Sequence, residues 1–217
     1  EEADEILLRF KIKCPKCGAQ LKSSYNFNLM FKIENESLYL RPETAQGIFV
    51  NFKNLFNYSR SVLPIIVCQI GKGFRNEISP RQALIRMREF TQAEVEVFYE
   101  GSDSFDMESI RNGPKINFLR NTGETASTSA YNAISDGIVS NRAMAYFINK
   151  TFVLLTSIGL DPAALRAREH SPQERAHYSS ETWDFEFFMD DEWIEIVGIS
   201  DRNSYDLSRH QEASGQD

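Results

Sequence analysis

The sequence predicts an α+β fold in which helices flank an antiparallel β-sheet. Strand-like segments fall into two blocks, residues 63–100 and 182–200, instead of alternating with helices along the chain. A strongly apolar helical segment, residues 142–160, lies between the blocks, and within each block two strands follow one another directly. With 217 residues, of which 41% are hydrophobic, the chain can bury one substantial core.

The first block begins with a helix and continues with two strands. Apolar residues recur at three- and four-residue spacing from Thr44 to about Tyr58, which predicts an amphipathic helix that begins just after Pro42. The run "LPIIVCQIGKGF" (63–74) predicts a buried strand, and the alternation in "MREFTQAEVEVFYE" (87–100) predicts a half-buried one. The long polar loop between them is unusual for a compact domain unless it has a function.

The middle of the chain has a different character. Asp, Ser, Gly and Asn dominate up to Asn141, an apolar helix follows, and a charged stretch comes next. We therefore expect a mostly helical insertion at 100–182 within a core formed by 1–99 and 183–217. The strands "TWDFEFFM" and "EWIEIVGIS" flank Asp190 and Asp191, which predicts a hairpin, and helix-like spacing follows from Asp201.

The bulk properties exclude several classes of protein. A net charge of −7 argues against nonspecific coating of nucleic acid. Three cysteines do not make a secreted disulfide framework, and the N-terminus is acidic where a secretory signal is basic and then apolar. No apolar run reaches the roughly 18 residues of a membrane span. We expect a cytoplasmic protein without a membrane partner.

The loop after the first strand is strongly cationic. It contains Lys72, Arg75, Arg81, Arg86 and Arg88 against the single acid Glu77. Guanidinium groups offer forked donors that suit phosphate oxygens, although a solvated charged loop has the same composition. Carboxylates in the neighbouring segments favour a site in which acids bind a cation beside arginines that bind phosphate: Glu43, Glu94, Glu96, Glu192, Glu195 and Asp201.

Five ordered motifs resemble a known family. They are "FNLMF", "YLRPETAQGIFVNFKNL", "GKGFRNEISPR" with "IRMREFTQAEVEVF", "AHYSSETWDFEF" and "EWIEIVGISDRNSYDL". In order and spacing these motifs resemble the class II aminoacyl-tRNA synthetases, and among them the dimeric glycyl-tRNA synthetases. The resemblance covers nearly the whole chain and is weakest at 100–140. It implies the class II catalytic core and a ligase that activates glycine with ATP and transfers it to tRNA(Gly).

The resemblance assigns the residues of the ATP site. Arg75 corresponds to the arginine that holds the α-phosphate of ATP and the carboxylate of the amino acid, and its charge would stabilise the transition state. Glu77 would accept a hydrogen bond from the adenine amino group, and Phe90 would stack on the adenine ring. Arg86 would contact phosphates or the acceptor end of the tRNA, and Glu195 would hold Mg²⁺.

Glycine offers no side chain to recognise, so its ammonium group must be bound and larger amino acids excluded. The resemblance gives Glu43 and Glu94 to the ammonium group and Arg202 to the orientation of the substrate, in a pocket that rejects a β-carbon by clash. Glu43 could instead be an acid that the helix dipole favours. Because adenylate formation needs no general base, we expect structural or surface roles for the histidines, which are His170, His177 and His210.

The resemblance also implies parts outside this sequence. Motif 1, which builds the homodimer of the full-length enzyme, is expected before residue 1, and motif 3 and an anticodon-binding domain after Asp217. This chain alone is therefore expected to be weakly active or inactive. The alternative is a non-catalytic module that keeps the fold to bind tRNA or a protein partner.

The N-terminal segment contains a CxxC motif at Cys14 and Cys17. This spacing supplies half of a structural zinc site, which normally needs four ligands. Cys68 lies in an apolar strand, so we expect a buried thiol there instead of a third ligand. A thioredoxin-like role is disfavoured because the motif lacks a βαβ setting.

Overall fold

The computed structural model describes residues 2–21, 23–24, 27–34, 37–78, 80, 85–101 and 104–215. The elements in chain order are α1 (Glu2–Arg9), α2 (Ala45–Val50), α3 (Phe52–Tyr58), β1 (Ile65–Phe74), β2 (Glu89–Phe98), η2 (Met107–Ile110), β3 (Lys115–Leu119), β4 (Thr125–Ser129), α4 (Ala130–Ser135), α5 (Arg142–Ser157), η3 (Pro162–Ala164), β5 (Leu165–Glu169), β6 (Glu181–Met189), β7 (Glu192–Asp201) and α6 (Tyr205–Ser214). No helix within the described residues is long and apolar enough to cross a membrane.

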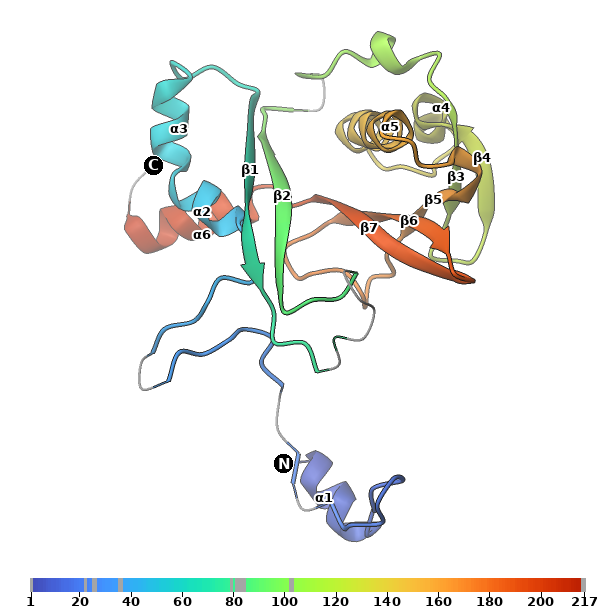
Figure 1. The fold of residues 1–217 in the computed structure, drawn as a ribbon. Coiled ribbons are helices and arrows are strands. Elements are labelled where there is room, and N and C mark those ends of the chain that lie inside the picture. The colour runs from blue at the N-terminus through green and yellow to red at the C-terminus, as the bar shows by residue number, and fades with distance from the viewer. Residues whose placement is uncertain are drawn as a thin grey trace. The chain divides into compact units, whose positions relative to one another are not determined.

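The chain divides into two compact units. Unit 1 comprises Glu1–Gln46 and Cys68–Glu94, and unit 2 comprises Gly47–Val67 and Val95–Asp217. Strands β1 and β2 form a two-stranded sheet and run in opposite directions (Figure 1). The remaining strands form a five-stranded sheet in the order β4-β3-β5-β6-β7, which lies in unit 2.

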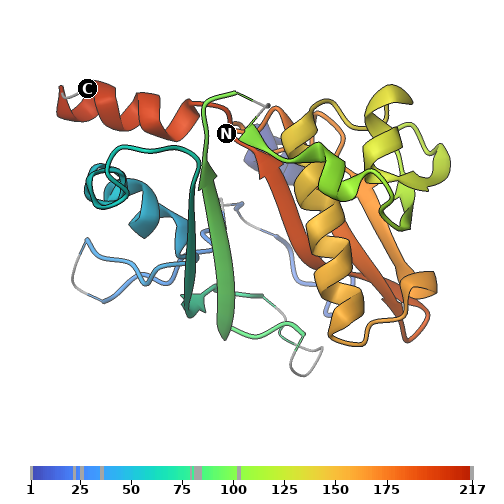
Figure 2. The same cartoon turned by 90° about the horizontal axis from the view of Figure 1, so that it is seen from above.

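The hydrophobic core of unit 2 lies on one face of the five-stranded sheet. Helix α5 lies across this face (Figure 2), and its buried residues include Ile148 and Phe152. They share one cluster with strand residues that alternate along the sheet, as the period of two requires: Ile116, Phe118, Leu165, Ala167, Trp183 and Phe185. Only the β3–β5 pair is parallel, and the other adjacent pairs of this sheet are antiparallel.

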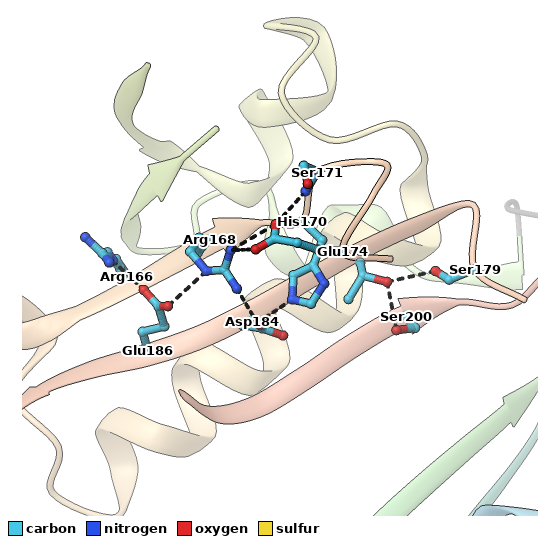
Figure 3. A network of polar contacts seen from close by, with 10 residues as sticks. Arg166, Arg168, His170, Ser171, Glu174, Ser179, Asp184, Glu186 and Ser200 are labelled. Atoms are coloured by element: carbon cyan, nitrogen blue, oxygen red, sulfur yellow. Dashed lines mark hydrogen bonds and ion pairs between the residues drawn. The ribbon is translucent and has the colours of Figure 1, made fainter. Parts of the chain in front are cut away.

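The opposite face of the same sheet carries charged side chains in register. Arg166 lies opposite Glu186, and Arg168 lies opposite Asp184, across the β5–β6 pair. Arg168 Nε donates to Glu186 Oε1 at 2.9 Å and its Nη2 to Asp184 Oδ2 at 3.1 Å, and His170 Nε2 also contacts Asp184 (Figure 3). Asp184 is only 2% exposed, so this network compensates a buried carboxylate.

Most of the predicted elements are confirmed. The α+β class is confirmed, and Asp190 and Asp191 form the turn between β6 and β7 with φ of +52° and +64°, as a type I′ turn requires. The helix predicted from Thr44 is present but interrupted between α2 and α3. There Asn51 Nδ2 donates to Gly47 O at 2.8 Å, a local bond of the kind that competes with regular helix.

Two expectations differ from the structure. The segment 100–182 is not simply helical, because strands β3, β4 and β5 lie within it and belong to the same sheet as β6. Strand β5 was not predicted because its arginines give it the composition of a charged surface segment. In the structure these arginines pair with carboxylates of β6. The assignment of 100–182 as an insertion stays a prediction.

The strand predicted at 63–74 is present as β1, but the prediction that it is buried was wrong. Alternate residues of β1 are exposed, with Ile66 at 59% and Ile70 at 72%, and Cys68 lies on the same exposed side. The reason is that β1 belongs to a two-stranded sheet, in which a period of two leaves one side of the strand uncovered.

Candidate active site

Arg75 lies at the end of β1, where three segments of unit 1 meet. Its backbone N–H donates to Arg88 O at 2.9 Å, and its Nε donates to Pro42 O at 3.3 Å. Its guanidinium carbon lies 5.4 Å from the centroid of the Phe90 ring, a cation–π contact. The predicted phosphate-binding arginine and the predicted adenine-stacking ring are therefore neighbours, and both are partly exposed.

Two glycines of β1 make this arrangement possible. A Cβ atom on Gly73 would lie 3.0 Å from two atoms of the Phe90 ring and 3.1 Å from Gln92 Nε2. On Gly71 it would lie 2.8 Å from Arg41 Nη2. A side chain at either position would displace its neighbours, so these glycines allow the side chains of adjacent segments to approach the strand closely.

Glu94 is fixed by the segment that precedes α2. Its Oε2 accepts hydrogen bonds from both the backbone N–H and the hydroxyl of Thr44, which is 1% exposed. The neighbouring Glu43 accepts a bond from the backbone N–H of Gln46 at 3.4 Å, in the first turn of α2. This contact supports the helix-terminal role for Glu43, and its role toward an ammonium group stays a prediction.

The segment Arg41 to Thr44 connects these features. Arg41 Nε donates to Lys72 O at 2.8 Å, and the backbone N–H of Phe74 donates to Arg41 O at 2.9 Å. Arg75 binds the carbonyl of Pro42, and Glu94 binds Thr44, so the two predicted site residues contact positions on either side of Glu43. The structure thus brings Arg75, Phe90 and Glu94 together around one short segment of unit 1.

Thr44 and Gln92 were not predicted as site residues. The sequence pattern predicts Thr44 only as the start of a helix. Its position directly after Glu43, a predicted site residue, was the signal that could have indicated a role in the site. Gln92 lies on β2 two residues before Glu94, on the same face of the strand. Its Nε2 atom is buried without a hydrogen-bond partner within the described part of the chain, and an amide in this state is a group that a bound polar ligand could satisfy.

The rest of the basic loop is only partly described. Glu77 O accepts a hydrogen bond from Arg88 Nε at 3.1 Å, and Arg86 is exposed. Arg81 lies outside the described residues. The proposed contacts of Glu77 and Arg86 with ATP or tRNA therefore stay predictions.

Two further predicted residues belong to unit 2. Glu195 lies on β7 opposite Glu186, and its side chain is exposed. Arg202 follows β7 and forms a bidentate pair with Asp206, with Nε–Oδ2 at 2.7 Å and Nη2–Oδ1 at 2.8 Å. Asp206 was not predicted. The signal available for it was its spacing of four residues from Arg202 in a helix-like segment.

The environment of Arg202 favours its charged form. Burial, the largest single influence, lowers the pKa of Arg202, but the hydrogen bonds and charge of Asp206, together with the charges of Tyr178 and Glu96, outweigh it. The pKa of this guanidinium therefore lies above its usual value. Nearby, burial raises the pKa of Tyr99, and the negative charge of Asp201 raises it further.

The CxxC motif lies in a tight backbone turn. The Cys14 N–H donates to Ala19 O at 2.8 Å, Gly18 N–H donates to Cys14 O at 2.9 Å, and Gly18 has a φ of +71°. Backbone N–H groups of Cys17 and Lys16 lower the pKa of the Cys14 thiol, which favours the thiolate that binds metal. Within the described ranges, however, no cluster of three or more potential metal ligands exists. The motif alone fits half of a zinc site.

Comparison with known proteins identifies the family of the chain. The family described as "tRNA synthetase class II core domain (G, H, P, S and T)" matches residues 25–210, and the chain belongs to this family. The chain is 45% identical over 230 residues to the glycine–tRNA ligase of Pyrococcus abyssi (strain GE5 / Orsay). It is 42% identical over 235 residues to that of Methanococcus maripaludis (strain C6 / ATCC BAA-1332). Both matches cover 100% of this chain, but only 40% and 41% of the relatives.

The fold is also found in solved structures. A prolyl-tRNA synthetase of Giardia lamblia, solved in complex with prolyl-adenylate, superposes with a TM-score of 0.52 at 15% sequence identity. The superposition covers 83% of this chain and 31% of that one. At this identity the likeness establishes the fold of the catalytic core and nothing about substrates.

Proposed function

We propose that this chain is part of the catalytic core of a cytoplasmic glycine–tRNA ligase. The observation that carries the proposal is the match over the whole chain to enzymes of that name, at 45% identity for the Pyrococcus abyssi relative. The neighbourhood of Arg75, Phe90 and Glu94 supports it. Within one small region these residues supply a cationic hydrogen-bond donor for phosphate, an aromatic ring for stacking and a carboxylate. The complete enzyme would act as a homodimer on ATP, glycine and tRNA(Gly).

The first step of this reaction is a displacement at the α-phosphorus of ATP. A carboxylate oxygen of glycine forms a bond to phosphorus, the bond to the β-phosphate oxygen breaks, and pyrophosphate leaves with the electron pair. Negative charge accumulates on the α-phosphate oxygens, so a fixed cationic donor beside them lowers the barrier. Arg75 fits this role, since Pro42 O and the Phe90 ring hold it in place without neutralising it.

The other residues would bind and orient the substrates. Phe90 would stack against adenine, Glu77 would accept from the adenine amino group, and Arg86 would contact phosphates or the acceptor end of the tRNA. Glu43 and Glu94 would bind the glycine ammonium group, and Arg202 would orient the substrate. Glu94 suits this task because Thr44 fixes the direction of its carboxylate.

The metals have separate tasks. Mg²⁺, when bound, neutralises charge on the ATP phosphates, and Glu195 offers the oxygen ligand that it prefers. Zn²⁺ would be bound by Cys14 and Cys17 in a structural role, provided that further ligands complete the site.

Glycine-dependent exchange of pyrophosphate into ATP by the full-length protein tests the proposal. We expect exchange with glycine and none with alanine, because a pocket crowded by charged side chains excludes a β-carbon. Calorimetry on the present chain with a non-hydrolysable glycyl-adenylate analogue is the second measurement. If the full-length protein bound ATP but showed no exchange with glycine, the ligase proposal would fail, and a module that binds tRNA or a protein partner would replace it.

A further inference from the structure

Arg202 is held by an unusually complete set of contacts within unit 2. Both oxygens of Asp206 accept from its guanidinium group, at 2.7 Å and 2.8 Å. Asp206 itself is 7% exposed, and the Arg202 side chain is 16% exposed. A charge-assisted bidentate pair of this kind fixes both the position and the plane of the guanidinium group.

Aromatic rings from two other segments add to this restraint. The guanidinium carbon of Arg202 lies 3.7 Å from the centroid of the Tyr178 ring and 4.9 Å from that of Phe49. The Tyr178 ring is supported in turn by Tyr205, at 6.4 Å between centroids, and by His177 at 5.4 Å. Three other segments of unit 2 therefore restrain Arg202: the part of α2 that carries Phe49, the segment before β6 and α6.

The pair with Asp206 uses only part of the guanidinium group. An arginine carries five N–H donors, and Asp206 takes one on Nε and one on Nη2. The remaining donors face away from that edge in a fixed fork. Because the charge of Arg202 is already compensated by Asp206, this arginine is better suited to orient a small zwitterion than to attract a polyphosphate.

We propose that Asp206 is a positioning residue that sets the affinity for glycine by holding Arg202, with Tyr178 as its second support. This rests on the proposed function, in which Arg202 contacts the amino-acid substrate. Without the carboxylate, the long arginine side chain regains rotamers that do not present its donors to the substrate. The substrate must then order the side chain on binding, which weakens binding of glycine and leaves ATP binding unchanged.

Steady-state pyrophosphate exchange by the full-length protein carrying Asp206→Asn tests this role. Asparagine keeps the size of the side chain, but it has no negative charge and only one oxygen that can accept a hydrogen bond from Arg202. We expect KM for glycine to rise about tenfold or more, as for loss of a charge-assisted pair, while KM for ATP and kcat stay within about twofold. The matched control is Glu212→Gln, which removes an exposed acid paired with Arg209 on the same helix, and we expect no change in either KM.

A double-variant cycle separates positioning from a general effect on folding. If Asp206 acts through Arg202, Asp206→Asn adds nothing to KM for glycine in an Arg202→Ala background. Should Asp206→Asn fail to fold, Tyr178→Leu is measured in the same two backgrounds, with the same expectation.

Three results would count against these proposals in different ways. An unchanged KM for glycine in a folded variant would overturn the role of Asp206 alone, and so would losses that add in the double variant. A wild-type protein without glycine-dependent exchange would instead refute the proposed function, and this inference with it.

Discussion

Arg75 in unit 1 and Arg202 in unit 2 are both predicted to contact substrate, but the protein holds them by different means. Arg75 donates to a neutral carbonyl at 3.3 Å and lies over an aromatic ring. Arg202 is held by a buried carboxylate and two rings. The contacts that fix Arg75 are thus uncharged groups, whereas Arg202 is fixed by a charged partner.

The same difference extends to the units as wholes. The main hydrophobic cluster lies in unit 2, and on the other face of its sheet Arg168 binds Glu186, Asp184 and Glu174. In unit 1, the described part of the basic loop is exposed at Arg86 and Arg88, and the Lys72–Glu89 pair has both side chains more than half exposed.

This contrast separates stability from chemistry. Charges that are paired and buried hold a fold together, whereas a charge that binds a phosphate must remain available until the ligand arrives. We therefore expect substitutions in the network of Arg168, Asp184 and Glu186 to affect mainly unfolding, and substitutions around Arg75 to affect mainly turnover. The following changes test this division, beginning with the largest effect.

Asp184→Ala is expected to have the largest effect on stability. It leaves His170 without its buried carboxylate and removes one of the three carboxylates that pair with Arg168, and breaking a buried pair of this kind costs about 3 kcal/mol. Urea denaturation followed by circular dichroism measures the change in the free energy of unfolding. The control is Glu108→Gln, which removes an exposed acid paired with Arg111 and should leave the unfolding midpoint unchanged. A midpoint in Asp184→Ala equal to that of the wild type would contradict a stabilising network.

Arg75→Ala is expected to have the largest effect on activity. Loss of one fixed donor to the transition state lowers the rate by about 100-fold or more, which corresponds to about 2.7 kcal/mol. Glycine-dependent pyrophosphate exchange by the full-length protein measures it, and the unfolding midpoint should stay close to that of the wild type. Arg111→Ala removes an equally cationic but exposed side chain as the control. Near-normal exchange in Arg75→Ala would refute the role assigned to its charge.

Glu94→Gln should have a smaller and more selective effect. Glutamine can still accept hydrogen bonds from Thr44, so the local structure is kept while the negative charge is lost. We expect KM for glycine to rise about tenfold, as for a charge-assisted hydrogen bond to the ammonium group, with KM for ATP unchanged. Glu89→Gln is the control on the same strand, because Glu89 pairs with the exposed Lys72. A rise in KM for ATP alone would remove Glu94 from the glycine site.

Much of the fold was predictable because local signals decide it. The Asp-Asp turn, the apolar face of α5 and the existence of β2 each follow from a few neighbouring residues. The alternation along β2 did not predict which side is covered, because Gln92 and Glu94 are partly buried while Val95 is 54% exposed. Strands β3 and β5 were missed because their identity depends on partners far away in sequence. Arg166 and Arg168 look like surface charges until Glu186 and Asp184 are placed opposite them. The exposure of Cys68 likewise depends on which side of β1 is covered.

The candidate site was predictable to a lesser extent. Its charged members were found from motifs, because phosphate and ammonium groups require particular side chains. The residues that orient them, Thr44 for Glu94 and Asp206 for Arg202, were missed. Such partners can be of many residue types, and only the folded geometry shows which carboxylate or hydroxyl lies within reach.

Gly73→Ala tests whether the close approach of the Phe90 ring to β1 is needed for ATP binding. The added methyl group would lie 3.0 Å from the Phe90 ring, closer than ordinary contact, so the ring must move. We expect a cost of about 1 kcal/mol, seen as a rise of about fivefold in KM for ATP with little change in KM for glycine. Gly198→Ala is the matched control, since its methyl group would meet Asp184 at an ordinary 3.5 Å. If both variants left KM for ATP unchanged, the position of the Phe90 ring would not matter for the nucleotide, and the assignment of that ring to adenine would have to be abandoned.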